Sequence, residues 1–585
     1  MSLLNKIIPR PEFPRPDFER CDWLNLNGEW EFEFDDENVG EAECWQDEGG
    51  KEFSRKIVVP FCFQSSVSGI SDTGLHEVMW YKRFFNISEG MKGKRILLNF
   101  GAVDYHARVW INGRFVGEHK GGYIPFMFEV TNHVNENENL IVVRVEDCYD
   151  TVQPRGKQYW KEKPDRCWYT ATSGIWQTVW LEAVGEVHIE RIRLTPDIDR
   201  RCVFGEIYLD KEMQNLLLDI DVKYMGEEIV KLSLNLKDRI TKFTICIKEE
   251  DSIDEIHYWT PETPNLYDVQ LTISKNETLI DSVKTYFGMR KISVDGDMIM
   301  LNNRPFYQKL ILDQGYWPES LLTPPSDDAI IHDIEMTKKM GFNGARKHQK
   351  IEDPRYYYWA DKLGLLVWGE MPSAYNFNAE EMESITREWT GFINRDYNHP
   401  CIITWVPLNE SWGVRNIYAD KNQQDFGVAL YYILRALDGT RLISTNDGWE
   451  NVKADFCSIH DYIAWGEEFI EKFGDKNKLH EISTSGRMLF AQGIKYDGQP
   501  VLLTEYGGIA FENMDKDSWG YNGAAKDEKS FLERYSSITG AVRATKYIRG
   551  YCYTQLTDVM QEINGLMTEE RELKVSLDEI RKINE

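Results

Sequence analysis

Two glutamates in the second half of the chain have the context of catalytic residues. Glu410 follows the apolar run Cys401-Ile-Ile-Thr-Trp-Val-Pro-Leu, and Glu505 follows the apolar run Pro500-Val-Leu-Leu-Thr. A pair of carboxyl groups at one site is suited to glycosidic cleavage, because one protonates the leaving oxygen while the other attacks the anomeric carbon or activates water. A separation of about 5 Å predicts retention of configuration, and one of about 9 Å predicts inversion.

The elements that would position these glutamates are apolar runs alternating with amphipathic stretches in residues 291–585. We predict strands at 307–313, 344–348, 365–370, 402–410, 442–446, 457–462, 501–505 and 550–555. We predict helices at 327–340, 354–363, 380–396, 423–437 and 529–544. Eight strands alternating with helices predict a (β/α)8 TIM barrel, whose active site lies at the carboxyl ends of the strands. A doubly wound sheet would need a glycine-rich turn after its first strand, and none follows residue 313.

The first half of the chain has the pattern of antiparallel sheets. Residues 1–184 contain short alternating runs rich in aromatic and β-branched residues, with a hairpin signal at Asn112-Gly113, so we predict a β jelly-roll sandwich. Residues 185–290 continue in strands over a length typical of an immunoglobulin-like β-sandwich. The chain is therefore predicted to have three domains, at 1–184, 185–290 and 291–585.

The composition excludes some partners. The chain has 68 Lys and Arg against 96 Asp and Glu, a net charge of −28, which disfavours binding to nucleic acid or to anionic lipid. No apolar stretch approaches the roughly 18 residues of a membrane helix. The ten cysteines are scattered singly and no signal peptide is evident, so we expect a cytoplasmic protein; a signal removed from the sequence is the alternative. No assembly signal is present, and a homo-oligomer stays open.

Six motifs along the chain resemble glycoside hydrolase family 2, the family of β-galactosidases, β-glucuronidases and β-mannosidases. The resemblance covers nearly the whole chain and follows the family's order. The motifs are Cys21-Asp-Trp-Leu-Asn-Leu-Asn-Gly-Glu-Trp, Val109-Trp-Ile-Asn-Gly-Arg-Phe-Val-Gly, Ser173-Gly-Ile-Trp-Gln-Thr-Val-Trp, Tyr286-Phe-Gly-Met-Arg, Trp405-Val-Pro-Leu-Asn-Glu-Ser-Trp and Leu502-Leu-Thr-Glu-Tyr-Gly.

The resemblance implies roles for particular residues. Glu410 would be the acid/base and Glu505 the nucleophile, while Asn409 would bind the sugar 2-hydroxyl. Tyr462 matches the tyrosine that bonds the nucleophile in this family, and Arg346 matches the arginine beside it, whose charge would keep that carboxylate ionised. For Arg346 a barrel salt bridge is the alternative.

Other polar residues at predicted strand ends are weaker candidates for substrate binding, because each would serve equally well at the barrel rim. They are Asp313, His348, Glu370, Asp447, His460 and Asp461. His348 lies in the basic cluster Arg346-Lys-His-Gln-Lys, which would contact an acidic sugar or balance the carboxylates.

Three departures from the family pattern surround the expected sugar site. The first strand, Tyr307-Gln-Lys-Leu-Ile-Leu-Asp, lacks the His- and Glu-rich segment that helps large β-galactosidases bind magnesium, so we predict no metal and no cofactor. Gln561-Glu-Ile-Asn-Gly lacks the Asn-x-Lys pair of β-glucuronidases. Thr554 or Gln555 stands where many relatives have a tryptophan.

These features together predict a retaining, exo-acting glycosidase that removes a terminal β-linked sugar, with a β-galactosidase-like specificity first. A β-glucuronidase, galacturonidase or pentosidase of the same family is the alternative. A transglycosylase would share the same intermediate. A non-catalytic carbohydrate-binding protein is the alternative of another class, and the presence of both glutamates argues against it.

Overall fold

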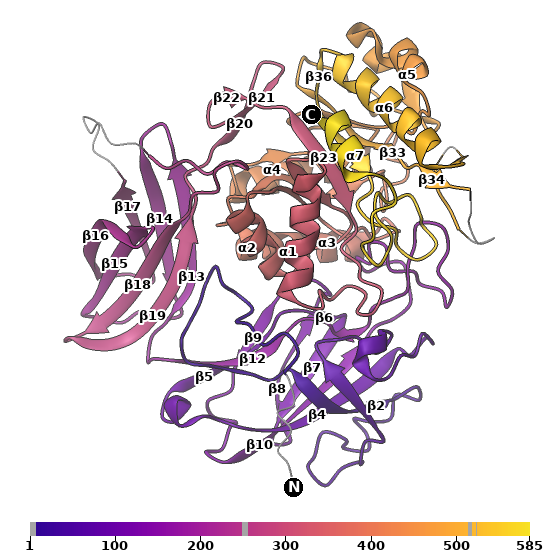
Figure 1. The fold of residues 1–585 in the computed structure, drawn as a ribbon. Coiled ribbons are helices and arrows are strands. Elements are labelled where there is room, and N and C mark those ends of the chain that lie inside the picture. The colour runs from indigo at the N-terminus through magenta and orange to yellow at the C-terminus, as the bar shows by residue number, and fades with distance from the viewer. Residues whose placement is uncertain (1–7, 248–255, 513–517, 522) are drawn as a thin grey trace.

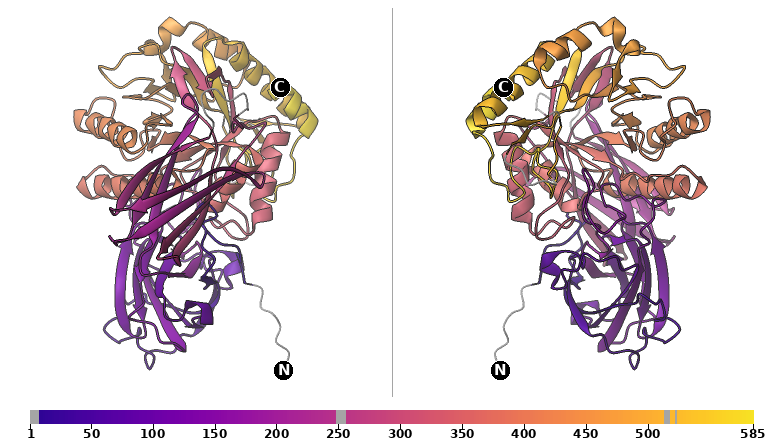
Figure 2. Two further views of the ribbon diagram at one scale, coloured as in Figure 1. Left: turned by 90° about the vertical axis from the view of Figure 1, so that its left-hand side faces the viewer. Right: turned by 90° about the vertical axis from the view of Figure 1, so that its right-hand side faces the viewer.

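The computed structural model describes residues 8–247, 256–512, 518–521 and 523–585. The chain forms an N-terminal β-sandwich, a second β-sandwich and a C-terminal barrel (Figure 1). Both views in Figure 2 show the barrel above the N-terminal sandwich, in contact with it. One hydrophobic core runs between them, because Tyr123, Tyr169 and Trp176 of the sandwich are buried in the same cluster as the barrel strands.

The N-terminal sandwich is made of two antiparallel sheets whose inner faces share a hydrophobic core. One sheet has the order β1 (Trp23–Asn25), β12 (Val179–Val184), β5 (Arg95–Phe100) and β9 (Phe126–Glu129). The other has the order β3 (Arg55–Val59), β2 (Gly28–Phe34), β4 (Val78–Asn86), β10 (Glu138–Glu146), β7 (His106–Ile111) and β8 (Arg114–Lys120). Asn112 and Gly113 join β7 to β8 with φ of 51° and 73°, the positive values that a tight hairpin turn requires.

The second sandwich packs a three-stranded sheet against a four-stranded sheet. The first contains β13 (Ile189–Asp197), β14 (Cys202–Leu209) and β17 (Ile240–Cys246). The second contains β16 (Glu227–Leu236), β15 (Leu216–Tyr224), β18 (Tyr267–Lys275) and β19 (Thr278–Phe287). A small three-stranded sheet of β20 (Ile292–Asp295), β21 (Met298–Leu301) and β22 (Arg304–Pro305) leads into the barrel.

The barrel contains one parallel sheet of eight strands, which confirms the predicted TIM barrel. In the order of the sheet the strands are β28 (Leu442–Ile443), β26 (Ile402–Val406), β25 (Leu366–Glu370), β24 (Gly344–Lys347), β23 (Gln308–Asp313), β36 (Ile548–Thr554), β33 (Val501–Gly507) and β30 (Cys457–His460). The predicted fourth strand is too long, because β26 ends at Val406 and Pro407 has no N–H for the ladder. The chain pairs again as β27 (Leu408–Asn409) with β29 (Asn446–Asp447).

Seven α-helices of the described residues lie in the barrel part of the chain. The five predicted ones are α1 (Asp327–Lys339), α2 (Pro354–Leu363), α3 (Ala379–Asp396), α4 (Lys421–Leu437) and α6 (Glu528–Ala544). The sequence analysis missed α5 (Gly466–Phe473) and α7 (Leu577–Asn584), which have only 8 residues each. None of the helices in the described ranges is long and apolar enough to cross a membrane.

A long segment of the N-terminal sandwich, residues 147–173, connects β10 to β11 (Gly174–Ile175) and reaches the barrel. We call it the β10–β11 loop. The backbone amides of Arg155 and Gly156 both donate to Ser373 O, and Trp168 Nε1 donates to the hydroxyl of Tyr375. In Figure 1 this purple loop lies beside the yellow loops that follow β36. The sandwich therefore contributes side chains to the mouth of the barrel.

Candidate active site

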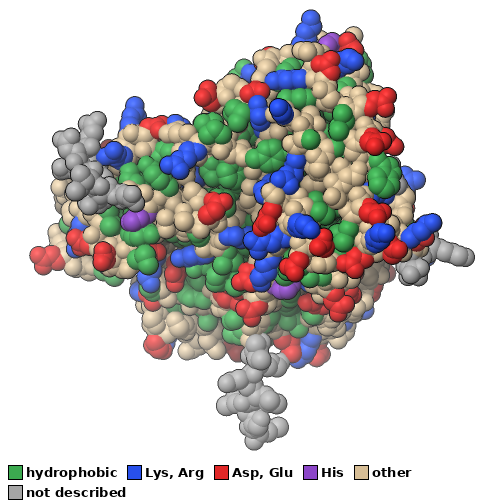
Figure 3. Space-filling view, turned by 45° about the horizontal axis from the view of Figure 1, so that its top comes forward, with side chains coloured by type: hydrophobic (Ala, Val, Ile, Leu, Met, Phe, Trp, Pro, Cys, Tyr) green, Lys and Arg blue, Asp and Glu red, His purple; other side chains and the backbone are tan. Residues whose placement is uncertain are grey.

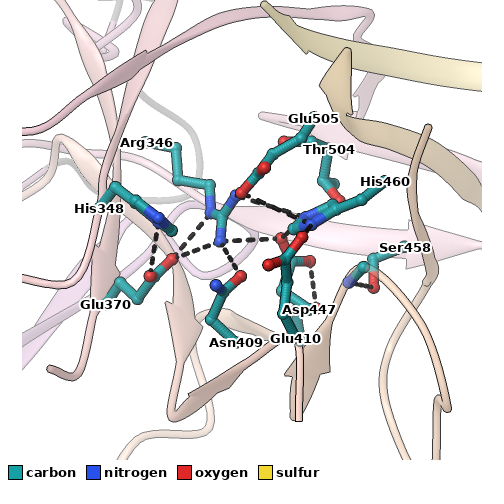
Figure 4. A network of polar contacts seen from close by, with 12 residues as sticks. Arg346, His348, Glu370, Asn409, Glu410, Asp447, Ser458, His460, Thr504 and Glu505 are labelled. Atoms are coloured by element: carbon teal, nitrogen blue, oxygen red, sulfur yellow. Dashed lines mark hydrogen bonds and ion pairs between the residues drawn. The ribbon is translucent and has the colours of Figure 1, made fainter. Parts of the chain in front are cut away.

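The carboxyl ends of neighbouring barrel strands bring a cluster of charged side chains together (Figure 4). Arg346 lies on β24, Glu370 on β25, His460 on β30 and Glu505 on β33. Asn409 and Asp447 end the paired strands β27 and β29, and Glu410 follows directly. Ionic and hydrogen-bonded contacts connect all of these side chains.

A left-handed turn directs Glu410 into this cluster. Glu410 and Ser411 have φ of 51° and 59°, a conformation that side chains other than glycine adopt at a cost. Two hydrogen bonds from the turn to β29 hold it, since Glu410 N donates to Asp447 O and Ser411 N donates to Asn446 Oδ1. The Glu410 side chain is 18% exposed and is thus open to solvent on one side.

Glu505 is more deeply buried and has a donor on each oxygen. Arg346 Nη1 donates to its Oε1 at 2.7 Å, and the hydroxyl of Tyr462 donates to its Oε2 at 2.5 Å. Burial alone would raise the pKa of Glu505, but the positive charges of His460 and Arg346 outweigh it and lower the pKa to about 2. Glu505 is therefore an oriented, ionised carboxylate at neutral pH.

Arg346 connects most of the cluster and is itself fully buried. Its guanidinium lies 2.7 Å from Glu370 and 3.2 Å from Asp447, and it donates to Asn409 Oδ1 at 2.7 Å. Burial raises the pKa of Glu370 to about 7 despite the opposing effect of Arg346. The planar fork of arginine is suited to several acceptors at once.

His460 lies between the two glutamates. Its Nδ1 is 2.8 Å from Glu410 Oε1 and 3.5 Å from Glu505 Oε1, and its Nε2 is 3.0 Å from Asp447 Oδ2. Burial lowers the pKa of His460, yet the surrounding carboxylates, Glu505 first, raise it to about 10. The ring is therefore a cation that can donate from both nitrogens.

Glu410 and Glu505 are close enough to act on one bond. One carboxylate oxygen of each and a ring nitrogen of His460 all lie within 4.8 Å of one another. Burial, followed by the negative charge of Glu505, raises the pKa of Glu410 above its ordinary value. The pKa values of the two carboxyl groups are thus shifted in opposite directions, which favours the protonated form of Glu410 and the ionised form of Glu505.

Asn409 has one polar atom without a partner. Its Oδ1 accepts from Arg346, which fixes the amide so that Nδ2 points the other way. Nδ2 is buried and makes no hydrogen bond to any residue that the structure describes. A buried amide donor without a partner is costly in a protein, so this atom is available to a ligand hydroxyl.

The remaining predicted residues divide into two groups. His348 joins the cluster, with its Nδ1 2.9 Å from Glu370 Oε1. Asp313 lies elsewhere: it pairs at 2.8 Å with Lys347, its neighbour in the β23–β24 register. Asp461 pairs with Lys472 at 2.6 Å. The structure thus brings Arg346, His348, Asn409, Asp447, His460 and Tyr462 together with the two glutamates. Asp313 and Asp461 contact this group through their backbones, at His348 N and Glu505 O, while their side chains pair with lysines.

The sequence analysis did not identify the residues that other loops add to this site. Lys157 of the β10–β11 loop lies with its Nζ 5.2 Å from the ring centroid of Trp412. Glu562, after β36, accepts from the hydroxyl of Tyr169 at 2.5 Å. No local pattern marks Lys157 or Glu562, because each reaches the site from an irregular segment.

Among the residues that the structure describes, two clusters have donor atoms close enough to hold a metal ion. Glu410, His460 and Glu505 form one, and Asp361, His399 and Cys401 form the other. In the second, Asp361 already accepts from Cys401 N, the hydroxyl of Tyr286 and His399. Both carboxylate oxygens of Asp361 and of Glu505, and Oε1 of Glu410, therefore already have hydrogen-bond partners within the protein.

Comparisons with known proteins cover nearly the whole chain. The family model for the sugar binding domain of glycosyl hydrolases family 2 matches residues 24–183, a second model of that family matches 187–290, and the model for its TIM barrel domain matches 292–585. A β-galactosidase of Thermoanaerobacter pseudethanolicus is 28% identical over 59% of this chain and 46% of its own length. A β-glucuronidase of Paenibacillus borealis is 23% identical over 84% of both chains.

The chain spans about half the length of several curated relatives that it matches, the Thermoanaerobacter protein among them. The Paenibacillus protein is closer to it in size. Among solved structures, a β-glucuronidase from Ruminococcus gnavus superposes with a TM-score of 0.79 over 99% of this chain and 100% of that one. At 18% identity this similarity concerns the fold. Because family models match three consecutive regions and the barrel model alone covers half of the chain, the protein belongs to glycosyl hydrolase family 2.

Proposed function

We propose that this protein is a retaining glycoside hydrolase that removes a terminal β-linked sugar by double displacement. The observation that carries the proposal is the pair Glu410 and Glu505, since one carboxylate oxygen of each lies within 4.8 Å of the other. Retaining enzymes have carboxyl groups about 5 Å apart, whereas inverting enzymes need room for a water between them.

In the first step Glu505 attacks the anomeric carbon while Glu410 donates its proton to the leaving oxygen. The pKa of Glu505, lowered to about 2, keeps the nucleophile ionised at neutral pH. The raised pKa of Glu410 keeps a proton available there. A covalent glycosyl-enzyme ester forms and the aglycone departs.

In the second step the same residue changes from acid to base. Esterification removes the negative charge of Glu505, which is the second largest cause of the raised pKa of Glu410. The pKa of Glu410 then falls, and His460 at 2.8 Å stabilises the carboxylate that results. Glu410 can now take a proton from the water that releases the sugar.

The unpartnered Nδ2 of Asn409 supports a contact with the sugar 2-hydroxyl. Such hydrogen bonds strengthen as the transition state develops positive charge on the sugar ring. The β10–β11 loop supports exo action, because the stacked rings of Trp168 and Trp412, 5.8 Å apart, form a wall between that loop and the turn after Glu410. A mouth walled on one side fits the end of a chain better than its interior.

The sugar remains a choice between two candidates. A β-galactoside is the first expectation from the sequence, and the Thermoanaerobacter relative is named a β-galactosidase. A glucuronide or galacturonide is the second, and both the Paenibacillus relative and the Ruminococcus structure are named β-glucuronidases. A pentoside has no specific observation in its favour.

A screen of 4-nitrophenyl glycosides together with one variant tests the proposal. We expect release of nitrophenol from at least one galactoside or uronide. We expect Glu505→Ala to abolish turnover and to regain it with azide, which fills the space of the carboxylate and yields the inverted glycosyl azide. Glu533→Ala, an exposed glutamate of α6, is the control and should behave as wild type.

Two outcomes would contradict the proposal. A glycosyl azide of retained configuration from Glu505→Ala would show that Glu505 is not the nucleophile. Hydrolysis of none of the glycosides would favour a non-catalytic carbohydrate-binding protein.

A further inference from the structure

Lys157 is a buried cation that the proposed mechanism does not use. The residue is 4% exposed and belongs to the β10–β11 loop of the N-terminal sandwich. Within the described ranges no carboxylate lies at ion-pair distance from its Nζ, and no residue accepts a hydrogen bond from it. Buried ammonium groups in proteins are normally paired, so an unpaired one calls for a reason.

The loop backbone holds Lys157 firmly in place. Lys157 O accepts from Tyr169 N at 2.8 Å across the loop, and Gly156 N donates to Ser373 O of the barrel at 2.9 Å. Gly156 has φ of 60°, and a Cβ at this position would lie 2.2 Å from Gln349 O. The loop thus touches the chain directly after β24, and Lys157 follows this contact point.

The surroundings place the ammonium group beside the turn that carries Glu410. Its Nζ lies 5.2 Å from the ring centroid of Trp412, two positions after Glu410, and 6.0 Å from that of Tyr169. Burial lowers the pKa of Lys157, but Cys167, Glu562, Glu505 and Glu410 together raise it, so the group is charged at neutral pH. The aromatic faces favour a cation without satisfying its hydrogen bonds.

The nearby acids already have donors of their own. Glu505 accepts from Arg346 and Tyr462, Glu410 lies 2.8 Å from His460 Nδ1, and Glu562 accepts from Tyr169. The ammonium group is therefore an additional positive charge at the site, with its hydrogen bonds free for a ligand.

We propose that Lys157 is a substrate-binding residue, supplied by the N-terminal sandwich, that pairs with an anionic substituent of the sugar and makes the enzyme selective for acidic sugars. The inference rests on the proposed glycosidase function. The anionic group is a carboxylate, as in a uronide, or a sulfate ester. This contact would take the role of the Asn-x-Lys pair, which the sequence lacks.

The test compares sugars that differ only in charge. The substrates are the 4-nitrophenyl β-glucuronide and β-galacturonide, the matching neutral glucoside and galactoside, and the galactoside 6-sulfate. We expect wild type to prefer a uronide or the sulfate ester over its neutral counterpart, and the preferred member identifies the anion. Lys157→Met should lower kcat/KM on that substrate by about 100-fold, because the anion loses a buried charge partner.

Neutral sugars and matched variants serve as controls. Lys157→Met should change kcat/KM on the neutral counterpart by less than about 3-fold, since the lost contact is worth little without an anion. Lys157→Arg keeps the charge and should retain the preference. Lys163→Met, an exposed lysine of the same loop, should match wild type on every substrate.

The outcomes separate this inference from the function on which it rests. Better hydrolysis of the neutral glycosides by wild type would overturn the role of Lys157 and leave the glycosidase function standing. An equal loss on charged and neutral sugars in Lys157→Met would also overturn it, because Lys157 would then act only on the charges of the glutamates. Hydrolysis of none of the substrates would overturn both.

Discussion

Tyr462→Phe should slow the second step of the reaction more than the first. The substitution removes the hydroxyl that donates to Glu505 Oε2 at 2.5 Å and keeps the ring, which stacks on Tyr521 with centroids 3.5 Å apart. When the glycosyl ester breaks, negative charge returns to Glu505, and the hydrogen bond strengthens. When the ester forms, that charge disappears and the bond weakens, so its loss does not penalise the first step to the same degree.

The magnitude follows from the kind of hydrogen bond. A bond to a charged group contributes about 1.5–3 kcal/mol, and each 1.36 kcal/mol is a factor of ten in rate. Since only part of the charge has returned in the transition state, we expect kcat to fall by about 10- to 100-fold. The glycosyl-enzyme should then accumulate, and KM should fall together with kcat.

A 2,4-dinitrophenyl glycoside is the appropriate substrate, because its reactive leaving group makes the second step limiting. Stopped-flow measurement should show a burst of dinitrophenol in the variant, of a size close to the enzyme concentration. Tyr506→Phe is the matched control, since its hydroxyl contacts Thr539 at 2.9 Å and no carboxylate. An equal decrease of kcat and kcat/KM, with KM unchanged and no burst, would refute the reasoning.

Two further predictions follow from the charges of the barrel. The pKa of Glu410 is raised by burial and by Glu505, so kcat/KM of the wild type should fall as the pH rises through that pKa. Glu410→Gln should lack this decrease at high pH on the 2,4-dinitrophenyl glycoside, and a decrease that persists in the variant would belong to another group. Glu352 is fully buried and lies 2.8 Å from both Lys347 and Lys350. Glu352→Gln should therefore lower the free energy of unfolding by about 3 kcal/mol and lower the thermal midpoint, whereas Glu533→Gln, at an exposed position, should change neither. Equal midpoints for the two variants would contradict the pairing.

The barrel could be predicted from the sequence because its strands are buried on both faces. Such strands read as apolar runs, and the runs that begin near Leu365, Ile402 and Val501 each correspond to an observed strand. The ends of strands were harder, as Pro407 shows, because a break in the ladder depends on one residue. Helix α5 was missed because eight residues give too few turns for a clear periodicity.

The cluster around the glutamates could be predicted in outline for a related reason. Parallel strands direct the side chains at their carboxyl ends to one mouth, so Arg346, Asn409 and His460 converge. The same rule is insufficient for Asp313, because its side chain forms an ion pair with Lys347, its neighbour in the register of the sheet. Whether a strand-end residue faces the substrate depends on the side chain beside it, which the sequence does not show.

The acidic surface and the active site have opposite electrostatic characters. The chain carries a net charge of −28, and acidic and basic side chains are intermingled over the face shown in Figure 3. At the mouth of the barrel, however, Arg346, His460 and Lys157 are all charged at neutral pH. Glu505 and Asp447 are ionised there, because neighbouring cations lower the pKa of each, while burial raises the pKa of Glu370 to about 7.

This local balance constrains what the site can bind. Arg346 and His460 suffice to hold Glu505 and Asp447 in their ionised forms, because both contact these carboxylates directly. Lys157 contacts neither at ion-pair distance, so its charge is not needed to balance them. When Glu505 becomes an ester, the site loses a negative charge and its positive potential rises. An anionic sugar would be held more tightly in that intermediate, whereas a neutral sugar would gain nothing, and the preference for charge should therefore be larger for the glycosyl-enzyme than for the first complex.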